Sequence, residues 1–280
     1  MNRLSKLNLK SKKLVELQEL CTSFGLSKSG TKSILDDRLT QHLQHISQSK
    51  FPNSLVSIDV GCVNLGFCHL KCDYNEFKPL ESPKITIKDW GVFSVDIPKE
   101  YHSYKFAVEC RRILDSQLYK PDASLYIVEK QSIRPIGIKQ MIPKPILRSS
   151  IFEAILLGMI VDRGTKNNVK CESINPQLIS TLFDLNGAGS YHRKKSNGVT
   201  LVNKWIKSGR FNCRDDLLTE YQLSKKKDDM ADSLIGGMAY VEWWFNSLSF
   251  LNSVPNTVEM MDIPTDNEKK KSKRRATLKV

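Results

Sequence analysis

Hydrophobic residues recur with two different periods along the chain, and the change of period divides it into two parts. Apolar side chains at helical spacing predict one helix over residues 12–24 and a second after Thr31. Gly25 is placed to end the first helix, and Thr31 can cap the second. The pattern therefore predicts a helical hairpin, followed by a polar linker, HLQHISQSKFPNS, at 42–54. The apolar faces of the two predicted hairpin helices comprise Leu14, Leu17, Cys21, Phe24, Ile34, Leu35, Leu39 and Leu43.

From Ser54 onward, short apolar runs predict strands between helical segments. Three consecutive strands followed by alternating helices and strands predict an α/β fold, a mixed sheet flanked by helices. Ser150 and Glu153 have the spacing of a capping box at a helix start, and Asn175 with Pro176 begins another helix. The expected strands are 54–60, 65–72, 85–95, 124–130 and 168–174, and the expected helices are 101–118, 150–161, one from 176, 198–208 and 231–245.

These patterns place three units along the chain: a hairpin with its linker at 1–48, a larger α/β domain at 54–250 and a basic tail at 251–280. The tail contains KKKSKRR, which fits a nuclear signal or a nucleic-acid arm. The first 15 residues contain no acid, which fits a mitochondrial presequence. The compartment is therefore open between mitochondrion and nucleus at this level.

The balance of charge changes the picture of what the protein binds. The 280 residues contain 43 Lys and Arg against 30 Asp and Glu, a net charge of +13 that suits a polyanionic partner, although general basicity for solubility gives the same number. Seven cysteines without a C-x-x-C pair argue against a disulfide framework. No apolar run reaches the roughly 18 residues of a membrane span. We expect no membrane contact and no small-molecule cofactor.

Carboxylates stand at places where apolar residues are expected. In SIDVGCVNLGF, Asp59 ends an apolar strand, and Glu129 ends another in SLYIVEK. A buried charge there must be hydrogen-bonded, paired or bound to a metal. In KKKDDMADS, Asp228 and Asp229 open the final helix, where acids also complement the helix dipole, and Asp232 lies one turn further in. Strand ends are where active sites of open α/β sheets form.

This acid set matches the ligands that hard divalent cations prefer. Two Mg²⁺ or Mn²⁺ ions roughly 4 Å apart stabilise the attacking and leaving oxygens of a phosphodiester displacement. Such a pair needs carboxylates from several elements, and Asp59, Glu129 and the three final-helix aspartates supply them. The sequence leaves open whether Asp228 or Asp229 is the ligand that precedes Asp232. Gly61 and Gly66 are expected to let the chain turn beside Asp59.

The order of these motifs resembles two known families. The Leu spacing and the turn GLSKSGTK resemble a SAP motif, which implies DNA contact by Lys28, Ser29, Thr31 and Lys32, whereas an ordinary capped hairpin is the alternative. The order SIDVGCVNLGF, IVEKQ, SINPQLIST and KKDDMADS resembles RuvC-type, RNase H-like Holliday-junction resolvases, and most of all the fungal mitochondrial cruciform-cutting enzymes. That resemblance implies catalytic acids at Asp59, Glu129, Asp229 and Asp232, a homodimer with contacts near residues 150–163, and symmetric metal-dependent nicks in four-way DNA junctions.

Two basic segments are the further candidates for DNA contact. KQSIRPIGIKQMIPKPILR follows Glu129, and its prolines predict a loop that faces DNA. NGAGSYHRKKSNG, at 186–198, is predicted to be a flexible loop, with DNA contact or plain solvation as its two interpretations. The aromatic run of Tyr240, Trp243, Trp244 and Phe245 is predicted to be core or interface. The candidate contacts are Lys130, Arg134, Lys139, Lys144, Arg148, Arg193, Lys194 and Lys195.

The function predicted from these residues and this resemblance is that of a crossover junction endodeoxyribonuclease that leaves 5′-phosphate and 3′-hydroxyl ends. Three alternatives stay open from the residues: another RNase H-like nuclease, a junction-binding or DNA-packaging protein without catalysis, and a sugar-kinase or actin-like ATPase. The last would also begin with D-x-G in a first strand, but it needs Gly-rich phosphate loops that the sequence does not contain.

Overall fold

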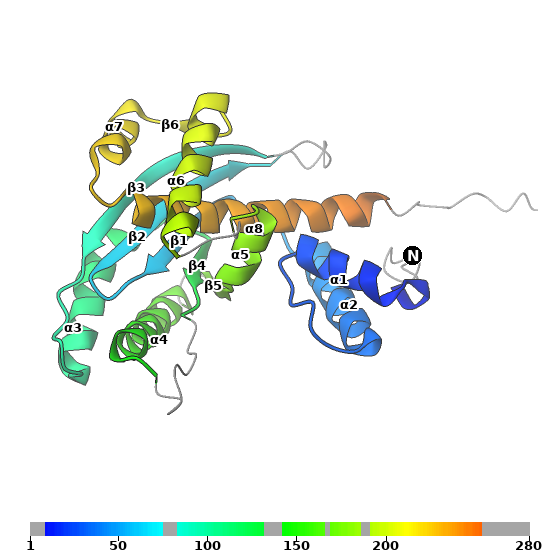
Figure 1. Cartoon of the computed structure of the whole chain (residues 1–280), viewed down its shortest axis with the longest axis horizontal. Coiled ribbons are helices and arrows are strands. Elements are labelled where there is room, and N and C mark those ends of the chain that lie inside the picture. Colours follow the sequence, from blue (N-terminus) through cyan, green and yellow to red (C-terminus); the bar gives the residue numbers. More distant parts are fainter. Residues whose placement is uncertain (1–8, 75–82, 132–141, 166–168, 186–190, 254–280) are drawn as a thin grey trace, which may run out of the picture.

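A mixed sheet of six strands, in the order β5-β4-β1-β2-β3-β6, forms the centre of the molecule, with helices on both faces (Figure 1). This computed structural model describes residues 9–74, 83–131, 142–165, 169–185 and 191–253. Strands β1, β2 and β3 are antiparallel neighbours, whereas β4 and β5 run parallel to β1 on its other side. The strands are β1 Ser54–Val60, β2 Asn64–Asp73, β3 Lys84–Ser94, β4 Leu125–Glu129, β5 Lys170–Ile174 and β6 Asn212–Cys213.

The helices confirm most of the predicted order. Thr31 caps α2 and Asn175 caps α5, as the sequence predicts. The helices are α1 Leu14–Ser23, α2 Lys32–Gln48, α3 Ser103–Ile113 with a π-helical extension Leu114–Leu118, α4 Lys144–Thr165, α5 Pro176–Leu182, α6 Tyr191–Ser208, α7 Asp215–Leu223 and α8 Lys227–Ser253, and a short 3₁₀ turn, Leu9–Ser11, precedes α1.

Several sequence predictions are wrong in their boundaries, and the final helix, predicted at 231–245, runs from Lys227 to Ser253. Residues from Tyr191 onward form α6, so most of the predicted loop at 186–198 is helix and its first residues lie outside the described part. Helix α4 begins at Lys144 because Pro145 is tolerated in a first turn, where its missing N–H is not needed. Ser150 and Glu153 are therefore not a capping box. Half of the predicted linker belongs to α2, which ends at Gln48.

The sheet has a separate apolar core on each face, because neighbouring residues of a strand point to opposite sides. In β1, Val56 and Ile58 join the core under α3 and α4, whereas Leu55 joins the core under α8. In β4, Tyr126 and Val128 face α3 and α4, and Ile127 faces α8. By the same alternation, Asp59 and Glu129 lie on the α8 face of the sheet.

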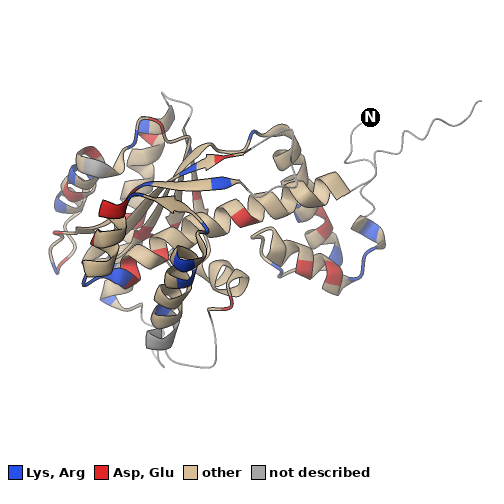
Figure 2. Ribbon diagram, turned by 90° about the horizontal axis from the view of Figure 1, so that it is seen from above, with Lys and Arg blue, Asp and Glu red and all other residues tan. Residues whose placement is uncertain are grey.

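Helix α8 runs across the sheet and continues past its edge to the N-terminal hairpin (Figures 1 and 2). Glycines allow it to lie close to the strands: a Cβ on Gly237 would be 2.7 Å from Leu70 Cδ1, and a Cβ on Gly236 would be 3.0 Å from Ser57 Oγ. Its first turn is anchored to β3, since Trp90 Nε1 donates to the Met230 carbonyl at 2.8 Å. The position of the start of α8 is thus set by the sheet.

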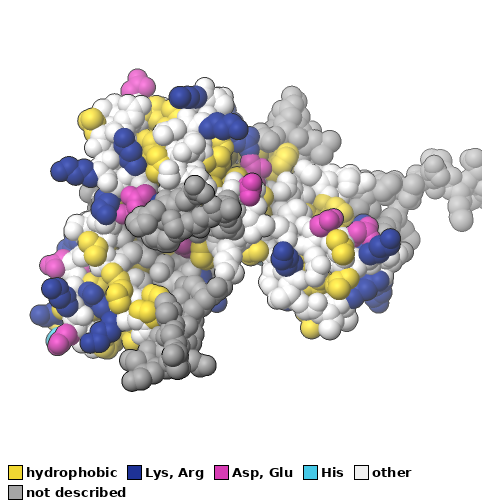
Figure 3. All heavy atoms as spheres, viewed as in Figure 1, with side chains coloured by type: hydrophobic (Ala, Val, Ile, Leu, Met, Phe, Trp, Pro, Cys, Tyr) yellow, Lys and Arg dark blue, Asp and Glu magenta, His cyan; other side chains and the backbone are white. Residues whose placement is uncertain are grey.

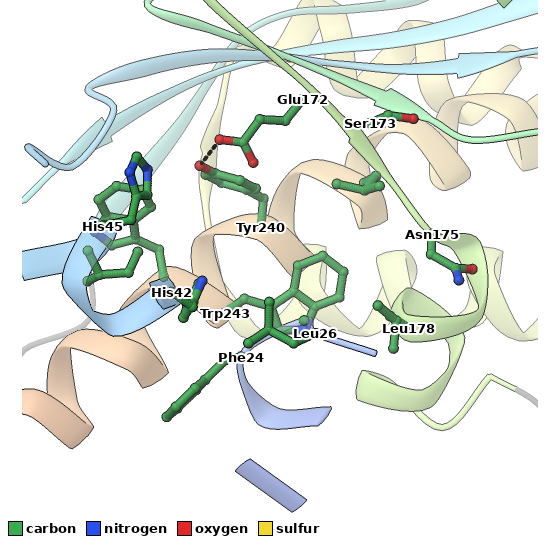
Figure 4. A pocket seen from close by; sticks show the side chains of 14 residues that line it. Phe24, Leu26, His42, His45, Glu172, Ser173, Asn175, Leu178, Tyr240 and Trp243 are labelled. Atoms are coloured by element: carbon green, nitrogen blue, oxygen red, sulfur yellow. Dashed lines mark hydrogen bonds between the residues drawn. The ribbon is translucent and has the colours of Figure 1, made fainter. Parts of the chain in front are cut away.

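The hairpin packs on the far half of α8 through aromatic residues. Tyr240, Trp243 and Trp244 are buried, which confirms the prediction that the aromatic run is core or interface. Gly25 has a positive φ of 71° and lies against the Trp243 ring, and His42 Nε2 is 2.9 Å from Ser247 Oγ. A cavity of about 240 Å³ remains in this junction, where Tyr240 donates to Glu172 at 3.1 Å (Figure 4).

The outer surface of α3 and α4 exposes apolar side chains beside basic ones (Figure 3). Leu147 and Val161 on α4 are 43% and 51% exposed, and a Cβ on Gly158 between them would meet no atom of the described residues within 4 Å. On α3, Tyr104 is 71% exposed. This face of α4 is therefore open to a neighbouring molecule as far as the described part of the chain is concerned.

Two further features concern the thiols and the helices of the described residues. All seven cysteines are free thiols, in agreement with the expectation from their spacing. No helix in the described ranges combines the length and apolar character that a membrane crossing requires.

Candidate active site

Asp59 and Glu129 lie next to each other at one edge of the sheet. Ile58 pairs with Val128 in the parallel register of β1 and β4, so each acid follows one residue after this last pair. Both strands end there, and both acids face α8. The sequence prediction that two strand ends each present a carboxylate to the same place agrees with this geometry.

A glycine in β2 lets the final helix come close to these strand ends. Gly66 pairs with Asp59 in the antiparallel register, and a Cβ on Gly66 would be 2.2 Å from the backbone oxygen of Asp229. Its role is therefore close backbone approach and not the turn that the sequence suggested, whereas Gly61 does lie in the turn, against the Asn64 carbonyl. Helix α6 packs against α8 less tightly, since a Cβ on Gly198 would be 3.4 Å from Asp232 Oδ1.

The acids are near enough to perturb each other. Burial raises the pKa of Asp59 well above its ordinary value, and the negative charges of Glu129, Asp232 and Asp229 raise it further. Asp229 is 9% exposed, so its carboxylate is also largely removed from solvent. Asp59 keeps some contact with solvent, yet protein atoms surround it closely. We call Asp59, Glu129, Asp228, Asp229 and Asp232 the carboxylate cluster.

Lys195 on α6 directs its ammonium group into the carboxylate cluster. Its Nζ lies 2.5 Å from Asp228 Oδ2 and 3.3 Å from Asp229 Oδ1. Burial raises the pKa of Asp228, but the hydrogen bond and charge of Lys195, together with a backbone hydrogen bond and the charge of Lys226, more than offset it, so this pKa is below its ordinary value. The sequence indicates Lys195 only as a DNA contact. Its pairing with the aspartates could not be predicted, because α6 and α8 are separated by another helix along the chain.

The donor set fits a divalent cation in its chemistry. Among the residues that the structure describes, no three His, Cys, Asp or Glu side chains form a ready-made metal site. Hard cations nevertheless bind carboxylate oxygens, and positive charge relieves the repulsion that raises the pKa of Asp59. Lys195 is the cation that now meets this need at Asp228 and Asp229. Binding of a metal by Asp228 or Asp229 would require Lys195 to release that carboxylate.

The predicted DNA contacts of the hairpin lie on its surface. Lys28, Ser29 and Lys32 are exposed, at the turn between α1 and α2. Arg38 holds this turn by donating to the carbonyls of Ser27 and Ser29. The turn is thus a fixed feature that presents two lysines to solvent.

The other predicted contacts are dispersed. Lys130 and Lys144 are exposed, whereas Arg148 donates to the Ile97 carbonyl at 3.2 Å and is only partly accessible. Arg134 and Lys139 lie outside the described residues, and so do the side chains of Arg193 and Lys194. Contact of these residues with DNA stays a prediction.

One buried acid near the cluster is not identified by the sequence pattern. Glu153 on α4 is 8% exposed and accepts a hydrogen bond from the Gln131 backbone N–H at 2.8 Å. Its spacing from Ser150 predicts a capping box instead. The signal that could have identified it is its place between Phe152 and Leu156 on an apolar helix face, where an acid must have a partner.

Two family models match this chain. The family model described as "Mitochondrial resolvase Ydc2 / RNA splicing MRS1" matches residues 55–217, and the SAP domain model matches residues 8–44. The mitochondrial cruciform cutting endonuclease 1 of Schizosaccharomyces pombe is 25% identical over 254 residues, which cover 82% of this chain and 92% of that protein.

Solved structures give the same fold. The crystal structure of the yeast mitochondrial Holliday junction resolvase Ydc2 superposes with a TM-score of 0.64 and 21% identity, over 86% of this chain and 98% of that one. A RuvC structure from Thermus thermophilus is more distant, with a TM-score of 0.40 and 14% identity over 67% of this chain and 94% of that one. The RNase H-like α/β fold with a SAP-like hairpin is thereby confirmed. The family model covers more than half of this chain, and the chain therefore belongs to the family of mitochondrial resolvase Ydc2 and the RNA-splicing protein MRS1.

Proposed function

We propose that this protein is a structure-selective endonuclease that resolves four-way DNA junctions in mitochondria. The observation that carries the proposal is that Asp59 and Glu129, at neighbouring strand ends, meet the start of α8, where the Asp229 backbone lies against Gly66, in a chain of the resolvase family. A cluster of this kind is costly in a protein that does not use it. The relatives named as mitochondrial resolvases support the substrate and the compartment.

Each member of the carboxylate cluster has a place in the proposed chemistry. Asp59, Glu129, Asp232 and either Asp228 or Asp229 would hold Mg²⁺ or Mn²⁺, two ions in the full form of the proposal. Bound cations would supply Lewis-acid stabilisation of the charge that develops on the phosphate. In-line attack by water on phosphorus expels the ribose 3′ oxygen, which leaves a 5′ phosphate and a 3′ hydroxyl.

The surfaces of the protein support a two-fold arrangement on DNA. The exposed apolar face of α4, with Leu147, Gly158 and Val161, would form a homodimer interface, so that two sites address opposed strands of the junction. The lysines of the hairpin turn would contact the phosphate backbone and supply affinity without sequence preference.

A second candidate function is nucleic-acid binding without cleavage. It is favoured by one observation: Lys195 pairs with Asp228 and Asp229, and the described residues form no ready-made metal site. The family model also includes an RNA-splicing protein in its description. The two candidates differ in whether a divalent cation turns binding into strand breakage.

The test is cleavage of a labelled four-way junction, compared with linear duplex and RNA/DNA hybrid, with Mg²⁺ or EDTA. We expect paired, metal-dependent nicks on the junction by the wild type, and junction binding without nicks by Asp59→Asn. Tight binding without cleavage under Mg²⁺ or Mn²⁺ would establish the second candidate. Preferential cleavage of the RNA/DNA hybrid would support a nuclease but show that four-way junctions are not its preferred substrate.

A further inference from the structure

A buried carboxylate on α4 reaches the point where the chain leaves β4. Glu153 Oε2 accepts from the Gln131 backbone N–H at 2.8 Å, and the Ser173 side chain of β5 also bonds this carboxylate. Burial raises the pKa of Glu153, while these bonds and the charge of Lys130 act in the opposite direction. The carboxylate thus connects α4, the exit from β4, and β5.

The exit from β4 directly follows Glu129 of the carboxylate cluster. On one side, Glu129 pairs with Ile174 of β5, and the next residue, Lys130, donates its N–H to the Ile174 carbonyl at 2.8 Å. On the other side, the N–H of Gln131 has left the sheet ladder, and Glu153 accepts it. The backbone after Glu129 is therefore held by one sheet bond and one side-chain bond.

We propose that Glu153 is a positioning residue that keeps the Glu129 carboxylate in register with Asp59 by fixing the exit from β4. The proposal rests on the nuclease function proposed above, since Glu129 has a catalytic place only there. Without the carboxylate, the partly buried Gln131 N–H loses its acceptor, and the strand end shifts to satisfy it. A shift of about 1 Å at a catalytic group can lower a rate by about 100-fold.

A purely structural role for Glu153 would give a stability loss alone, and the chain contains a matched control for it. Glu109 on α3 is 5% exposed, and its Oε1 accepts from the Asp96 backbone N–H at 2.8 Å, just after β3. It makes the same kind of bond at the exit of a strand that carries no member of the carboxylate cluster. Glu109→Ala therefore removes an equivalent bond, together with the ion pair between Glu109 and Arg112, without moving Glu129.

The experiment compares four variants of the full-length protein: Glu153→Ala, Glu153→Gln, Ser173→Ala and Glu109→Ala. Three quantities are measured: the single-turnover rate and KM on a labelled four-way junction, binding of Mn²⁺ by electron paramagnetic resonance, and thermal unfolding. Glu153→Gln keeps an oxygen that can accept from Gln131. Ser173→Ala removes only the second bond and serves where Glu153→Ala folds poorly.

For Glu153→Ala we expect a cleavage rate about 10- to 100-fold lower with KM within about twofold, and Mn²⁺ affinity about 10-fold weaker. Glu153→Gln should restore most of both, and Ser173→Ala should lower the rate about 2- to 5-fold. Glu109→Ala should unfold at lower temperature with an unchanged rate and an unchanged Mn²⁺ affinity.

Wild-type rate and Mn²⁺ affinity in Glu153→Ala or, where that variant does not fold, in Ser173→Ala would overturn the proposal. Equal losses in Glu109→Ala would also overturn it, because the effect would then be general destabilisation. A wild type that cleaves no junction contradicts the proposed function instead, and the Mn²⁺ titration then decides the role of Glu153 by itself.

Discussion

The backbone of Gly66 lies so close to the carbonyl oxygen of Asp229 that a Cβ at position 66 would be 2.2 Å from it. Atoms that are not bonded to each other do not approach so closely, so this pair sets how near α8 comes to β2. Asp59 pairs with Gly66 across the strands, which makes the same approach responsible for bringing the acids of two elements together.

Gly66→Ala should therefore separate the carboxylate cluster. We expect a loss of about 1–3 kcal/mol in unfolding free energy, as for overpacked cores, and cleavage of four-way junctions about 100-fold slower. Denaturant unfolding and a single-turnover cleavage assay measure the two effects. Gly91→Ala is the control, because its Cβ would be 3.3 Å from the Phe67 ring, away from α8. Unimpaired cleavage by Gly66→Ala would show that the close approach is not needed.

Asp59→Asn should stabilise the metal-free protein while abolishing cleavage. The pKa of Asp59 in the folded state is raised above its ordinary 3.8. Ionised Asp59 therefore destabilises the folded protein, and this loss of stability is absent below pH 3.8 and develops as pH rises through the folded-state pKa. At pH 8 in EDTA, Tm should rise by about 2–4 °C for each kcal/mol of repulsion removed. Near pH 3.5 the two proteins should unfold alike. A lower Tm for the variant at pH 8 would mean that Asp59 is a net stabilising charge.

Acid should loosen the hairpin from α8. Burial and then the charge of His45 lower the pKa of His42 to about 4, from an ordinary 6.5. Because the folded state binds the proton less well, stability is lost as pH falls from about 6.5 towards 4, by at most about 3.5 kcal/mol, at about 1.4 kcal/mol for each unit by which the pKa is lowered.

The measurement is Trp fluorescence against pH, since Trp243 and Trp244 line this contact together with the titratable Glu172. His42→Gln can keep a bond to Ser247 and carries no charge, so its transition should move to lower pH. His69, whose pKa is also lowered by burial, is unchanged in this variant and accounts for the transition that remains. Identical curves would assign the whole transition to groups other than His42.

Val161→Asp should break the proposed dimer. Val161 is 51% exposed on the apolar outer face of α4, and a charge there would face its own copy across a two-fold axis. Sedimentation velocity at micromolar concentration should show a dimer for the wild type and a monomer for the variant. Leu223→Asp is the control, since Leu223 is 78% exposed at the end of α7. A monomeric wild type would refute this interface.

Replacing Lys28 and Lys32 together by Ala should weaken binding equally for junctions of any sequence. The slope of log K against log salt concentration should fall by about 2, one unit for each phosphate that is no longer neutralised, while the cut positions stay the same. Lys84→Ala with Lys88→Ala removes the same charge from β3 and should change the slope little. An equal change of slope in both variants would mean that the hairpin lysines act only through the net charge of the protein and not through local phosphate contacts.

Local patterns in the sequence were sufficient for much of the fold. The bounds of β1 and the Asn175 cap follow from neighbouring residues, and the structure confirms both. Helix α6 begins earlier than its apolar pattern, and Lys195 near its start pairs with Asp228 and Asp229 on α8, an interaction that no local pattern contains. Helix α7 has only two buried positions, one of which, Tyr221, stacks on Trp90, and so its periodicity is too sparse to predict.

The residues of the candidate site also fall into those that local sequence predicts and those that it does not. Asp59, Glu129 and the aspartates of α8 could be predicted because an acid at the end of an apolar run is conspicuous. The roles of Gly66 and Glu153 could not, since each depends on an element distant in sequence that approaches within contact distance.

Helix α8 is continuous from Asp229 to the aromatic residues that hold the hairpin, and it therefore fixes the distance between the carboxylate cluster and the hairpin. The 14 steps along the helix from Asp229 to Trp243 span about 21 Å at about 1.5 Å per step, which corresponds to about six base-pair steps of about 3.4 Å. A tethered DNA-binding module would sample many distances from the chemistry. Here one continuous helix fixes the offset, so in the proposed function the place where the hairpin holds the DNA backbone would determine the place where that backbone is cut.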